Sequence, residues 1–451
     1  MKKFDVITIG GSASGLVASM TGKANYKDKS FLLIRKEKDA MVPCGIPYIF
    51  NALDSSDKNV MPLGGLQKSG VEFLQDEVIK INREDKTVET KNNGIYEYEK
   101  LIIATGSTPY KPTWLNGSTL ENVFTIPKDK IYLDEIKEKF NGMKKIVTIG
   151  AGFIGVEVSE QLSLAGKEVT LVEVLPSILG KAFDADISYM AQVELEAQGV
   201  CIKTGVKVTE ILGTDKVEGV LLENGEKIEA DAVILSMGYT PNVSLAKEAG
   251  LELNKLGAIK VDSYMRTDDC SIFAVGDCAS KVDFITRRST PIMLASTAAS
   301  EARVAGMNLY NLSIVRTFTG TIAIFSTKIG KTSFASAGVT EDEAKRNGFE
   351  VEIGYFEGID RHPGTLAGTS KQIVKLIATK DSDIIIGGEI VGGDSIGELI
   401  NVIGREIQNR VSVTELFVSQ IGTHPLLTAA PTNYPLIKAA ESIVLKKKKK
   451  N

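Results

Sequence analysis

The stretch Ile149-Gly150-Ala151-Gly152-Phe153-Ile154-Gly155 decides the fold of this chain. It closes a run of apolar, β-branched residues (145–149) that is typical of a buried parallel strand, and a helical pattern opens directly after it. In such a strand, turn and helix, the glycines permit a tight turn and let a pyrophosphate approach the amides of the helix N-terminus. The stretch therefore predicts a dinucleotide-binding unit.

An acidic residue, Glu173, follows the next predicted strand (residues 168–172). Dinucleotide-binding units place an acceptor for the ribose 2′-hydroxyl at this position. A carboxylate there repels a 2′-phosphate, and residues 171–175 contain no arginine that would bind one. The pattern favours NADH over NADPH.

A second and less regular copy of the fingerprint lies near the N-terminus, in Gly10-Gly11-Ser12-Ala13-Ser14-Gly15. Ser12 occupies the middle glycine position. The next predicted strand (residues 30–34) leads to Arg35 rather than to an acid, and Glu37 takes the ribose-binding role only if that strand runs two residues longer.

Three shorter signals extend this pattern. Residues 101–107 and 232–242 repeat one design, a strand that ends in a small-residue turn, so the chain is predicted to contain two similar dinucleotide modules. In residues 271–279 a strand delivers Asp277 to its C-terminal edge, where open α/β sheets bind ligands. Asp277 is a candidate acceptor for a sugar-like hydroxyl, or alternatively a turn or helix-cap residue.

Length and charge set broad limits. A chain of 451 residues is long enough for about three domains. Its 53 basic and 57 acidic residues give a net charge of −4, which indicates no nucleic-acid footprint. Without a signal peptide or a membrane span, we expect a soluble cytoplasmic protein. The final lysines, 446–450, are expected to be solvated and disordered, with a membrane or nucleic-acid role as the minor alternative.

The four cysteines form no CxxC pair, and the chain has only two histidines, so we predict no metal site and no disulfide scaffold. Cys201, Cys270 and Cys278 lie in or beside predicted strands, where a free cysteine behaves as a small buried hydrophobe.

Cys44 differs from the other cysteines because of its neighbours. It lies just beyond the predicted strand of residues 30–34, and residues 45–48 resemble the start of a helix. The positive end of a helix dipole lowers the pKa of a thiol and favours the reactive thiolate. Cys44 is therefore predicted to be redox-active, the alternative being a buried structural cysteine.

Together these motifs resemble the pyridine nucleotide-disulfide oxidoreductase family over nearly the whole chain. The resemblance is to the single-cysteine branch, which holds coenzyme A disulfide reductases, NADH oxidases, NADH peroxidases and persulfide or sulfur reductases. It implies an α/β fold with two Rossmann-like domains, for FAD and NAD, and a C-terminal α+β domain that forms a homodimer. The implied boundaries are 1–111 and 247–318 for FAD, 112–246 for NAD(P)H and 319–451 for the interface domain.

The same resemblance implies the cofactor contacts. Asp277 would hold the ribityl chain, and a helix over residues 296–309 would direct its N-terminus at the pyrimidine edge of the flavin. The implied NADH contacts are Gly150, Gly152, Phe153, Ile154, Gly155, Glu173 and Gly238. The implied FAD contacts are Gly10, Gly11, Ser12, Ala13, Ser14, Gly15, Arg35, Pro43, Val78, Ala104, Thr105, Gly106, Gly276, Asp277, Ala295 and Thr297.

Departures from the family pattern narrow the activity. Ile49 stands where two-cysteine members carry their second cysteine, and Ala13 stands where peroxidases and water-forming oxidases carry a histidine. His424 resembles the general acid that two-cysteine members supply across the dimer, although Ala429 replaces the acid that usually orients it. Tyr434 is the alternative acid, and His362 is expected to be a loop histidine.

By resemblance, the chain is therefore expected to be an FAD-dependent enzyme that uses NADH to reduce a small disulfide, persulfide or polysulfide. Cys44 would form a mixed disulfide with a thiol such as coenzyme A. Two other hypotheses remain open. One is an NADH oxidase or electron-transfer reductase that does not need the cysteine, and the other is a non-catalytic nucleotide-binding redox sensor.

Overall fold

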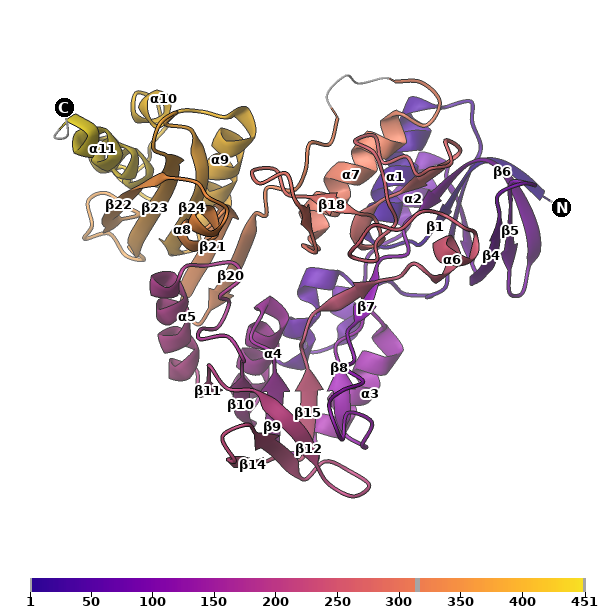
Figure 1. The fold of residues 1–451 in the computed structure, drawn as a ribbon, viewed down its shortest axis with the longest axis horizontal. Coiled ribbons are helices and arrows are strands. Elements are labelled where there is room, and N and C mark those ends of the chain that lie inside the picture. The colour runs from indigo at the N-terminus through magenta and orange to yellow at the C-terminus, as the bar shows by residue number, and fades with distance from the viewer. Residues whose placement is uncertain (1, 313–316, 449–451) are drawn as a thin grey trace.

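The computed structural model describes residues 2–312 and 317–448. Three units lie at the corners of a triangle (Figure 1): the N-terminal unit at the upper right, a second unit below, and the C-terminal unit at the upper left. After the second unit the chain returns to the first, where β17 (Ile272–Ala274) pairs in parallel with the first unit's sheet. The predicted fold class is confirmed: two Rossmann-like α/β units and a C-terminal α+β unit.

The first unit is built on a sheet with the order β3-β2-β1-β6-β5-β4, with β17 also paired to β6. Strands β3, β2, β1, β6 and β17 are parallel, whereas β5 and β4 add an antiparallel hairpin. The strands are β1 (Lys2–Ile9), β2 (Phe31–Arg35), β3 (Glu72–Gln75), β4 (Val78–Asn82), β5 (Thr87–Thr90) and β6 (Gly94–Ile103).

Two helices of the first unit, α1 (Ala13–Asn25) and α7 (Ala295–Met307), lie side by side. Their backbones meet at two glycines, because a Cβ on Gly306 would lie only 2.9 Å from the amide nitrogen of Gly22. Helix α7 begins one residue before the predicted start and ends two before the predicted end.

The other elements of the first unit are α2 (Gly64–Ser69), α6 (Ser244–Glu248), β18 (Lys281–Val282), β19 (Ser289–Thr290) and the 3₁₀ turns η1 (Pro43–Gly45), η2 (Pro47–Phe50), η3 (Ser56–Asn59) and η4 (Gly276–Cys278).

The second unit repeats the first. Its parallel sheet has the order β11-β10-β9-β15-β8, so β11-β10-β9-β15 corresponds to β3-β2-β1-β6. This agrees with the predicted pair of similar modules. The elements are β8 (Val123–Thr125), β9 (Lys145–Ile149), β10 (Glu168–Val172), β11 (Cys201–Lys203), β15 (Ala232–Leu235), α3 (Lys130–Phe140), α4 (Phe153–Leu164), α5 (Ala185–Ala197) and the antiparallel sheet of β12 (Val208–Leu212), β13 (Gly219–Leu222) and β14 (Lys227–Glu229).

A short antiparallel ribbon joins the first two units. It pairs β7 (Ser107–Pro109), on which the chain leaves the first unit, with β16 (Tyr239–Pro241), on which it returns. Thr240 faces Thr108 in the register of this ribbon. The exact boundaries at residues 111, 246 and 318 stay predictions.

The third unit is an antiparallel sheet with the order β20-β21-β24-β23-β22. Helix α9 packs its apolar stripe, including Leu399, Ile403 and Ile407, into the core of this unit. The elements are β20 (Phe325–Ile329), β21 (Thr332–Gly338), β22 (Val351–Ile359), β23 (Lys371–Thr379), β24 (Ile385–Gly392), α8 (Glu341–Arg346), α9 (Ile396–Asn409), α10 (Val413–Phe417), η5 (Pro431–Asn433) and α11 (Pro435–Lys448).

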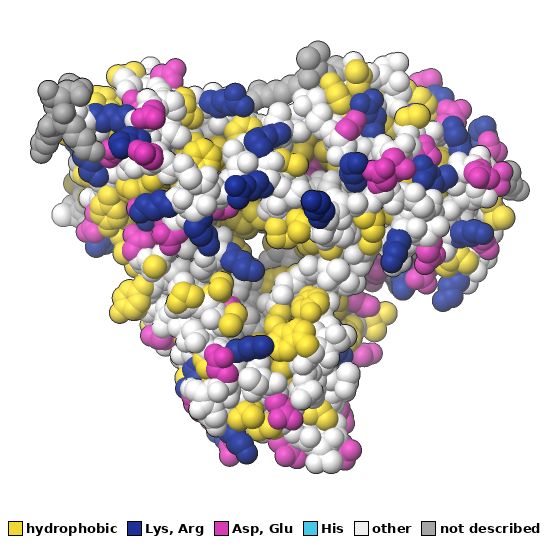
Figure 2. Space-filling view, in the orientation of Figure 1, with side chains coloured by type: hydrophobic (Ala, Val, Ile, Leu, Met, Phe, Trp, Pro, Cys, Tyr) yellow, Lys and Arg dark blue, Asp and Glu magenta, His cyan; other side chains and the backbone are white. Residues whose placement is uncertain are grey.

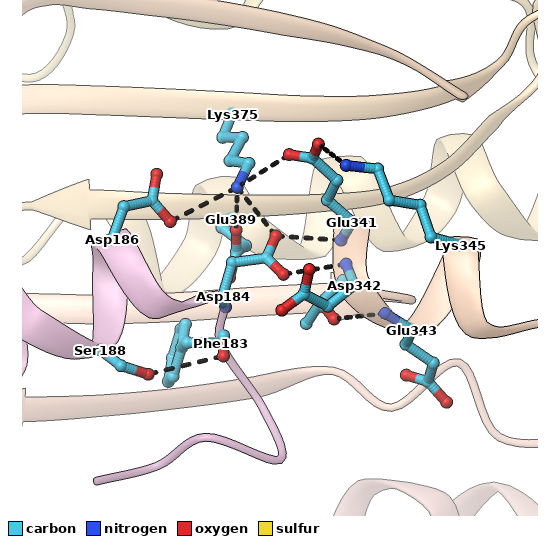
Figure 3. A network of polar contacts seen from close by, with 11 residues as sticks. Phe183, Asp184, Asp186, Ser188, Glu341, Asp342, Glu343, Lys345, Lys375 and Glu389 are labelled. Atoms are coloured by element: carbon cyan, nitrogen blue, oxygen red, sulfur yellow. Dashed lines mark hydrogen bonds and ion pairs between the residues drawn. The ribbon is translucent and has the colours of Figure 1, made fainter. Parts of the chain in front are cut away.

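An ionic cluster around the buried Lys375 joins the second and third units (Figure 3). The Nζ of Lys375 lies 2.8 Å from Asp184, 3.4 Å from both Asp186 and Glu341, and 3.5 Å from Glu389. Asp184 also accepts a hydrogen bond of 2.9 Å from the amide of Glu341, at the start of α8. Burial, with the Asp184 carboxylate beside it, raises the pKa of Glu389 to about 8. One lysine thus faces several carboxylates where the two units meet.

Two predictions about exposed residues are wrong. Cys201 is exposed because it begins β11, an edge strand, and Cys270 is exposed because it lies in a turn. Cys278 is buried, as predicted. The lysine run is not disordered where it is described, since α11 continues to Lys448 and Lys446 donates to the carbonyl oxygen of Ile353 at 2.7 Å. Residues 449 and 450 lie outside the described residues.

Charged side chains of both signs are interspersed over all three units on the face shown in Figure 2. No helix in the described part of the chain is both long and apolar enough to cross a membrane. Within residues 2–312 and 317–448, no group of His, Cys, Asp and Glu side chains is arranged to hold a metal ion.

Candidate active site

The two glycine loops have the same geometry. Gly10 and Gly150 have φ angles of +102° and +100°, which favour glycine. A Cβ on Gly10 would lie 2.2 Å from the carbonyl oxygen of Ala104, and one on Gly150 would lie 2.5 Å from that of Ser236. The first loop is therefore packed against the turn that follows β6, which contains Thr105 and Gly106. The second loop is packed in the same way against the turn that follows β15.

The last glycine of each loop serves close packing of the helix. A Cβ on Gly15 would lie 1.9 Å from the carbonyl oxygen of Gly10, and one on Gly155 would lie 1.9 Å from that of Gly150. Ala13 and Ser14 stand with Gly15 in the first turn of α1, and Phe153 and Ile154 begin α4. Phe153 stacks on Phe325 of the third unit, with ring centroids 5.1 Å apart.

The helices that follow the loops begin without side-chain caps. The N-cap residues, Ser12 for α1 and Gly152 for α4, make no capping hydrogen bond, and neither helix has an acid in its first turn. By contrast, Asp129 caps α3 and Ser412 caps α10. A Cβ on Gly152 would meet nothing within 4 Å, so there is open space beside the amides of α4. Uncapped amides beside open space fit the pyrophosphate of a dinucleotide.

Arg35 ends β2 and supports the first glycine loop. It is buried, donates to the carbonyl oxygen of Gly11 at 3.2 Å and to that of Glu37 at 2.8 Å, and stacks over Phe73 at 5.1 Å. Because β2 ends at Arg35, the strand extension that would give Glu37 a ribose-binding role does not occur. Arg35 holds the loop backbone, which the sequence pattern alone did not indicate.

Glu173 follows β10 directly, at the position that the sequence predicts. Its carboxylate accepts hydrogen bonds from the amides of Ala151 at 2.6 Å and Leu175 at 2.8 Å. These bonds hold the carboxylate against the second glycine loop, the expected place for an acceptor of a ribose hydroxyl.

Asp277 lies in η4, at the carboxyl edge of the first sheet, and is paired with a lysine from the second unit. Its Oδ2 lies 2.7 Å from the Nζ of Lys128 and accepts a 2.7 Å hydrogen bond from Ser107. Burial alone would raise the pKa of Asp277, but Lys128 and these hydrogen bonds outweigh burial and hold the pKa below its usual range. Sequence reasoning missed Lys128, because it lies between β8 and α3 in no motif.

Cys44 occupies the centre of η1, between Pro43 and Gly45, and its side chain is exposed. The prediction of a helix start at this point is wrong, because only the short 3₁₀ turns η1 and η2 follow. The predicted lowering of its pKa is wrong as well. Partial shielding of the thiol from water by neighbouring protein atoms raises the pKa of Cys44. The Glu157 carboxylate raises this pKa further, whereas Lys128 lowers it.

A buried asparagine holds the Cys44 turn in place. Asn59 donates from Nδ2 to the carbonyl oxygen of Val42 at 3.0 Å, and its backbone oxygen accepts from the Val42 amide at 2.8 Å. A Cβ on Gly45 would lie 1.9 Å from Oδ1 of Asn59. No motif marks Asn59, which lies 15 residues beyond Cys44.

Glu157, on α4, is a second group that sequence reasoning missed. It accepts a hydrogen bond of 2.8 Å from Thr327 of the third unit. Burial raises the pKa of Glu157 to about 7. Its charge also acts on Tyr48, whose pKa burial and Glu157 raise to about 12. Glu157 therefore brings a titratable carboxyl into electrostatic reach of Cys44.

The candidate acids lie in the third unit. His424 is exposed, and its Nδ1 accepts a hydrogen bond of 3.3 Å from the amide of Leu426, so its exchangeable proton is on Nε2. His362 contacts the loop that carries His424, because its Nδ1 lies 3.0 Å from the carbonyl oxygen of Thr428. Tyr434 is half-buried in the core of this unit, and burial raises its pKa.

The remaining predicted residues lie on the elements that bound this region. Ala295 and Thr297 form the first turn of α7, where Thr297 is 2.8 Å from the hydroxyl of Thr321. Val78 is buried at the start of β4, and Gly238 and Gly276 have φ angles of +97° and +77°. Asp277 lines a cavity of about 200 Å³ with Tyr239, Lys281, Pro291 and Met293 among others.

Comparison with known proteins agrees with this geometry. Residues 4–302 match the model of the pyridine nucleotide-disulphide oxidoreductase family, and residues 324–434 match the dimerisation domain of that family. An NADH oxidase from Methanocaldococcus jannaschii is 32% identical over 98% of this chain and 98% of its own. The NAD(P)H coenzyme A polysulfide/persulfide reductase of Pyrococcus horikoshii is 30% identical over 87% of this chain and 88% of its own.

A solved structure leads to the same family. The NAD-dependent persulfide reductase from A. fulgidus is 30% identical, with a TM-score of 0.91, and the match covers 99% of this chain and 84% of that one. The family binds FAD and NAD(P)H, which agrees with the two uncapped glycine loops. The protein is an oxidoreductase, and its chain belongs to the pyridine nucleotide-disulphide oxidoreductase family.

Proposed function

We propose that this enzyme uses NADH to reduce a small disulfide, persulfide or polysulfide through Cys44, with a coenzyme A-type thiol as the substrate thiol. The observation that carries the proposal is the exposed Cys44 turn, held by Asn59 within electrostatic reach of Asp277, Lys128 and Glu157. The P. horikoshii and A. fulgidus relatives, which are named for persulfide reduction, support it.

The protein would bind its cofactors through the two glycine loops. The first loop, with Arg35 behind it and Asp277 at the sheet edge, would hold FAD, and the second loop with Glu173 would hold NADH. The Glu173 carboxylate supports NADH over NADPH, because it would repel a 2′-phosphate. When bound, FAD would supply the two-electron chemistry that connects NADH oxidation to sulfur reduction.

Cys44 would perform the exchange chemistry. Its thiolate attacks one sulfur of R–S–S–R, forms the bond Cys44–S–S–R and releases R–S⁻. The electron pair then breaks this mixed disulfide, which restores the thiolate and releases the second R–S⁻. One NADH and one proton thus convert one disulfide into two thiols. Ile49 occupies the position of a second cysteine, so the mixed disulfide forms with the substrate thiol.

The leaving thiolate needs a proton, and His424 is the proposed donor. Its Nε2 carries the exchangeable proton, and its loop is exposed on the third unit. In a homodimer built through this unit, His424 would serve the partner's Cys44. Tyr434 is the second candidate, disfavoured by its half-buried position. The cytoplasmic location stays a prediction.

A second candidate function is NADH oxidation by oxygen or electron transfer to a carrier, without Cys44. The M. jannaschii relative, which is named as an NADH oxidase, favours it. Ala13 disfavours peroxide chemistry, because it occupies the position in the first loop where peroxidases and water-forming oxidases carry a histidine. A non-catalytic redox sensor is disfavoured, because both loops keep the first and last glycines of the fingerprint and the relatives are named as enzymes.

The two functions are separated by comparing Cys44→Ser with Cys270→Ser, which alters another exposed cysteine remote from both loops in the sequence. NADH should bleach the bound flavin in the wild type and in both variants under anaerobic conditions. We expect Cys44→Ser to lose at least 100-fold in reduction of coenzyme A disulfide or glutathione persulfide, and Cys270→Ser to keep wild-type rates. Undiminished turnover in Cys44→Ser would reject the proposal in favour of the oxidase.

A further inference from the structure

A fully buried ion pair lies beneath the turn that carries Asp277. Lys281, on β18, and Glu301, on α7, have side chains that are 2% and 0% exposed, and Nζ lies 3.2 Å from Oε1 and 3.3 Å from Oε2. A buried ion pair is in general no more stabilising than an apolar pair of the same volume, because both charges must leave water. Stability alone therefore gives no reason for charged residues here.

The ion pair makes hydrogen bonds with both the amide and the carbonyl oxygen of Gly276. The amide of Gly276 donates to Oε2 of Glu301 at 2.8 Å, and its carbonyl oxygen accepts from Nζ of Lys281 at 2.6 Å. Gly276 has a φ of +77°, and a Cβ there would lie 2.5 Å from Oγ of Ser14 in α1. The pair thus fixes the turn before Asp277 between α1 and α7.

The charges of the pair also act on Asp277, the proposed flavin-binding carboxylate. Burial tends to raise the pKa of Asp277, but Lys128 and, more weakly, Lys281 hold this pKa low. Burial raises the pKa of Glu301 to about 7, against the attraction of Lys281. Because Glu301 stands two turns into α7, the pair connects Asp277 to the helix that begins with Ala295.

We propose that Lys281 and Glu301 are positioning residues of the flavin site. They hold the Gly276 peptide, and with it Asp277, at a fixed place relative to α1 and the N-terminus of α7, and they set both the affinity for FAD and the reduction potential of the bound flavin. This inference rests on the proposed binding of FAD by Asp277 and α7.

The test uses full-length protein freed of FAD and three variants. Lys281→Met with Glu301→Leu removes both charges together, whereas Glu301→Gln and Lys281→Met remove one each. Glu389→Gln is the matched control, because Glu389 is an equally buried carboxyl beside a lysine, but at the junction of the second and third units. FAD affinity is measured by quenching of flavin fluorescence, and the potential by equilibration with redox dyes.

We expect the double variant to keep its melting temperature and to bind FAD at least tenfold more weakly. Glu301→Gln leaves a positive charge and should raise the flavin potential at pH 7, whereas in Lys281→Met the buried Glu301 carboxyl takes up a proton and the potential should stay near the wild-type value. The control should match the wild type in both measurements. A raised potential in Glu301→Gln but not in Lys281→Met decides in favour of the proposal even if the double variant fails to fold.

Wild-type affinity and potential in every folded variant would overturn the inference, whatever the melting temperatures. That result differs from failure of the proposed function, in which the wild-type protein itself would bind no FAD or show no bleaching by NADH.

Discussion

The Nζ of Lys128 lies 2.7 Å from Oδ2 of Asp277, so a lysine of the second unit neutralises the carboxylate that the first unit presents at its sheet edge. The same ammonium is the charged side chain that opposes the rise in the pKa of Cys44. Lys128 therefore connects the candidate flavin-binding acid with the candidate redox sulfur, although it lies in a segment between two elements of the second unit.

Replacement of this lysine should make Cys44 less reactive. In Lys128→Met the Asp277 charge is no longer compensated, so the pKa of the Cys44 thiol should rise and alkylation at pH 7.5 should slow about threefold to tenfold. The rate of iodoacetamide labelling is measured against pH in FAD-free protein that also carries Cys201→Ser and Cys270→Ser. Lys128→Arg should restore the profile.

The control for this experiment is Lys130→Met, because Lys130 pairs with Asp57 and Asp134 at the surface. An unchanged labelling profile in Lys128→Met would show that the lysine does not act on Cys44.

Glu157→Gln should have the opposite effect on Cys44. Burial raises the pKa of Glu157 to about 7, so its carboxyl is mostly neutral at pH 6 and mostly charged at pH 8. A charged Glu157 raises the pKa of the Cys44 thiol. We therefore expect the variant to be alkylated faster than the wild type at pH 8 and at the same observed rate at pH 6.

Glu343→Gln, in α8, is the control for that measurement, because burial also raises the pKa of Glu343 but its charged neighbours are Asp283 and Arg346 rather than Cys44 or Glu157. A ratio between Glu157→Gln and wild type that is constant across this pH range would contradict the prediction.

Two glycines of the second loop should respond differently to alanine. Gly155→Ala places a Cβ 1.9 Å from a backbone oxygen, so the second unit should lose stability and much of its soluble yield. Gly152→Ala meets no protein atom within 4 Å, and Ser12 shows that the equivalent backbone tolerates a side chain. We expect Gly152→Ala to keep its melting temperature and FAD content but to raise the KM for NADH at least tenfold. An unchanged KM would contradict the prediction and would mean that a side chain at this position, like that of Ser12 in the first loop, leaves room for the dinucleotide.

The cluster at Lys375 makes stability depend on pH. The folded protein raises the pKa of Glu389 to about 8 from an ordinary value of 4.5, so the folded state keeps a proton that the unfolded chain releases. This contribution is full below pH 4.5 and is lost as the pH rises towards 8. Glu389→Gln cannot titrate, and its free energy of unfolding in urea should fall by about 3 kcal/mol less than that of the wild type between pH 5 and pH 8. Glu398→Gln, on the exposed side of α9, should instead follow the wild-type curve.

Periodicity and glycine spacing were sufficient to predict the nucleotide units. Strand β10 has the predicted bounds, and Glu173 stands beside the second loop as the pattern requires, because both depend on local βα geometry. The Cys44 turn was misjudged, since a helix and two successive 3₁₀ turns begin with similar residues.

Partners that tertiary packing supplies left no local signal in the sequence. Lys128 approaches Asp277 from 149 positions away, and Glu157 lies 113 positions beyond Cys44. Lys375 and Asp184 meet only because two units pack together. Such contacts depend on the arrangement of the units, which hydrophobic periodicity does not encode.

The ribbon of β7 and β16 has a consequence for how this architecture is divided. Tyr239 faces Pro109 across the ribbon, so the chain exits and re-enters the first unit at adjacent points. The second unit is therefore attached as a cassette, and the two cut ends left by its excision would already be neighbours. A tight turn in place of residues 110–238 could reconnect them, which makes this ribbon the natural splice point for exchanging the second unit between relatives.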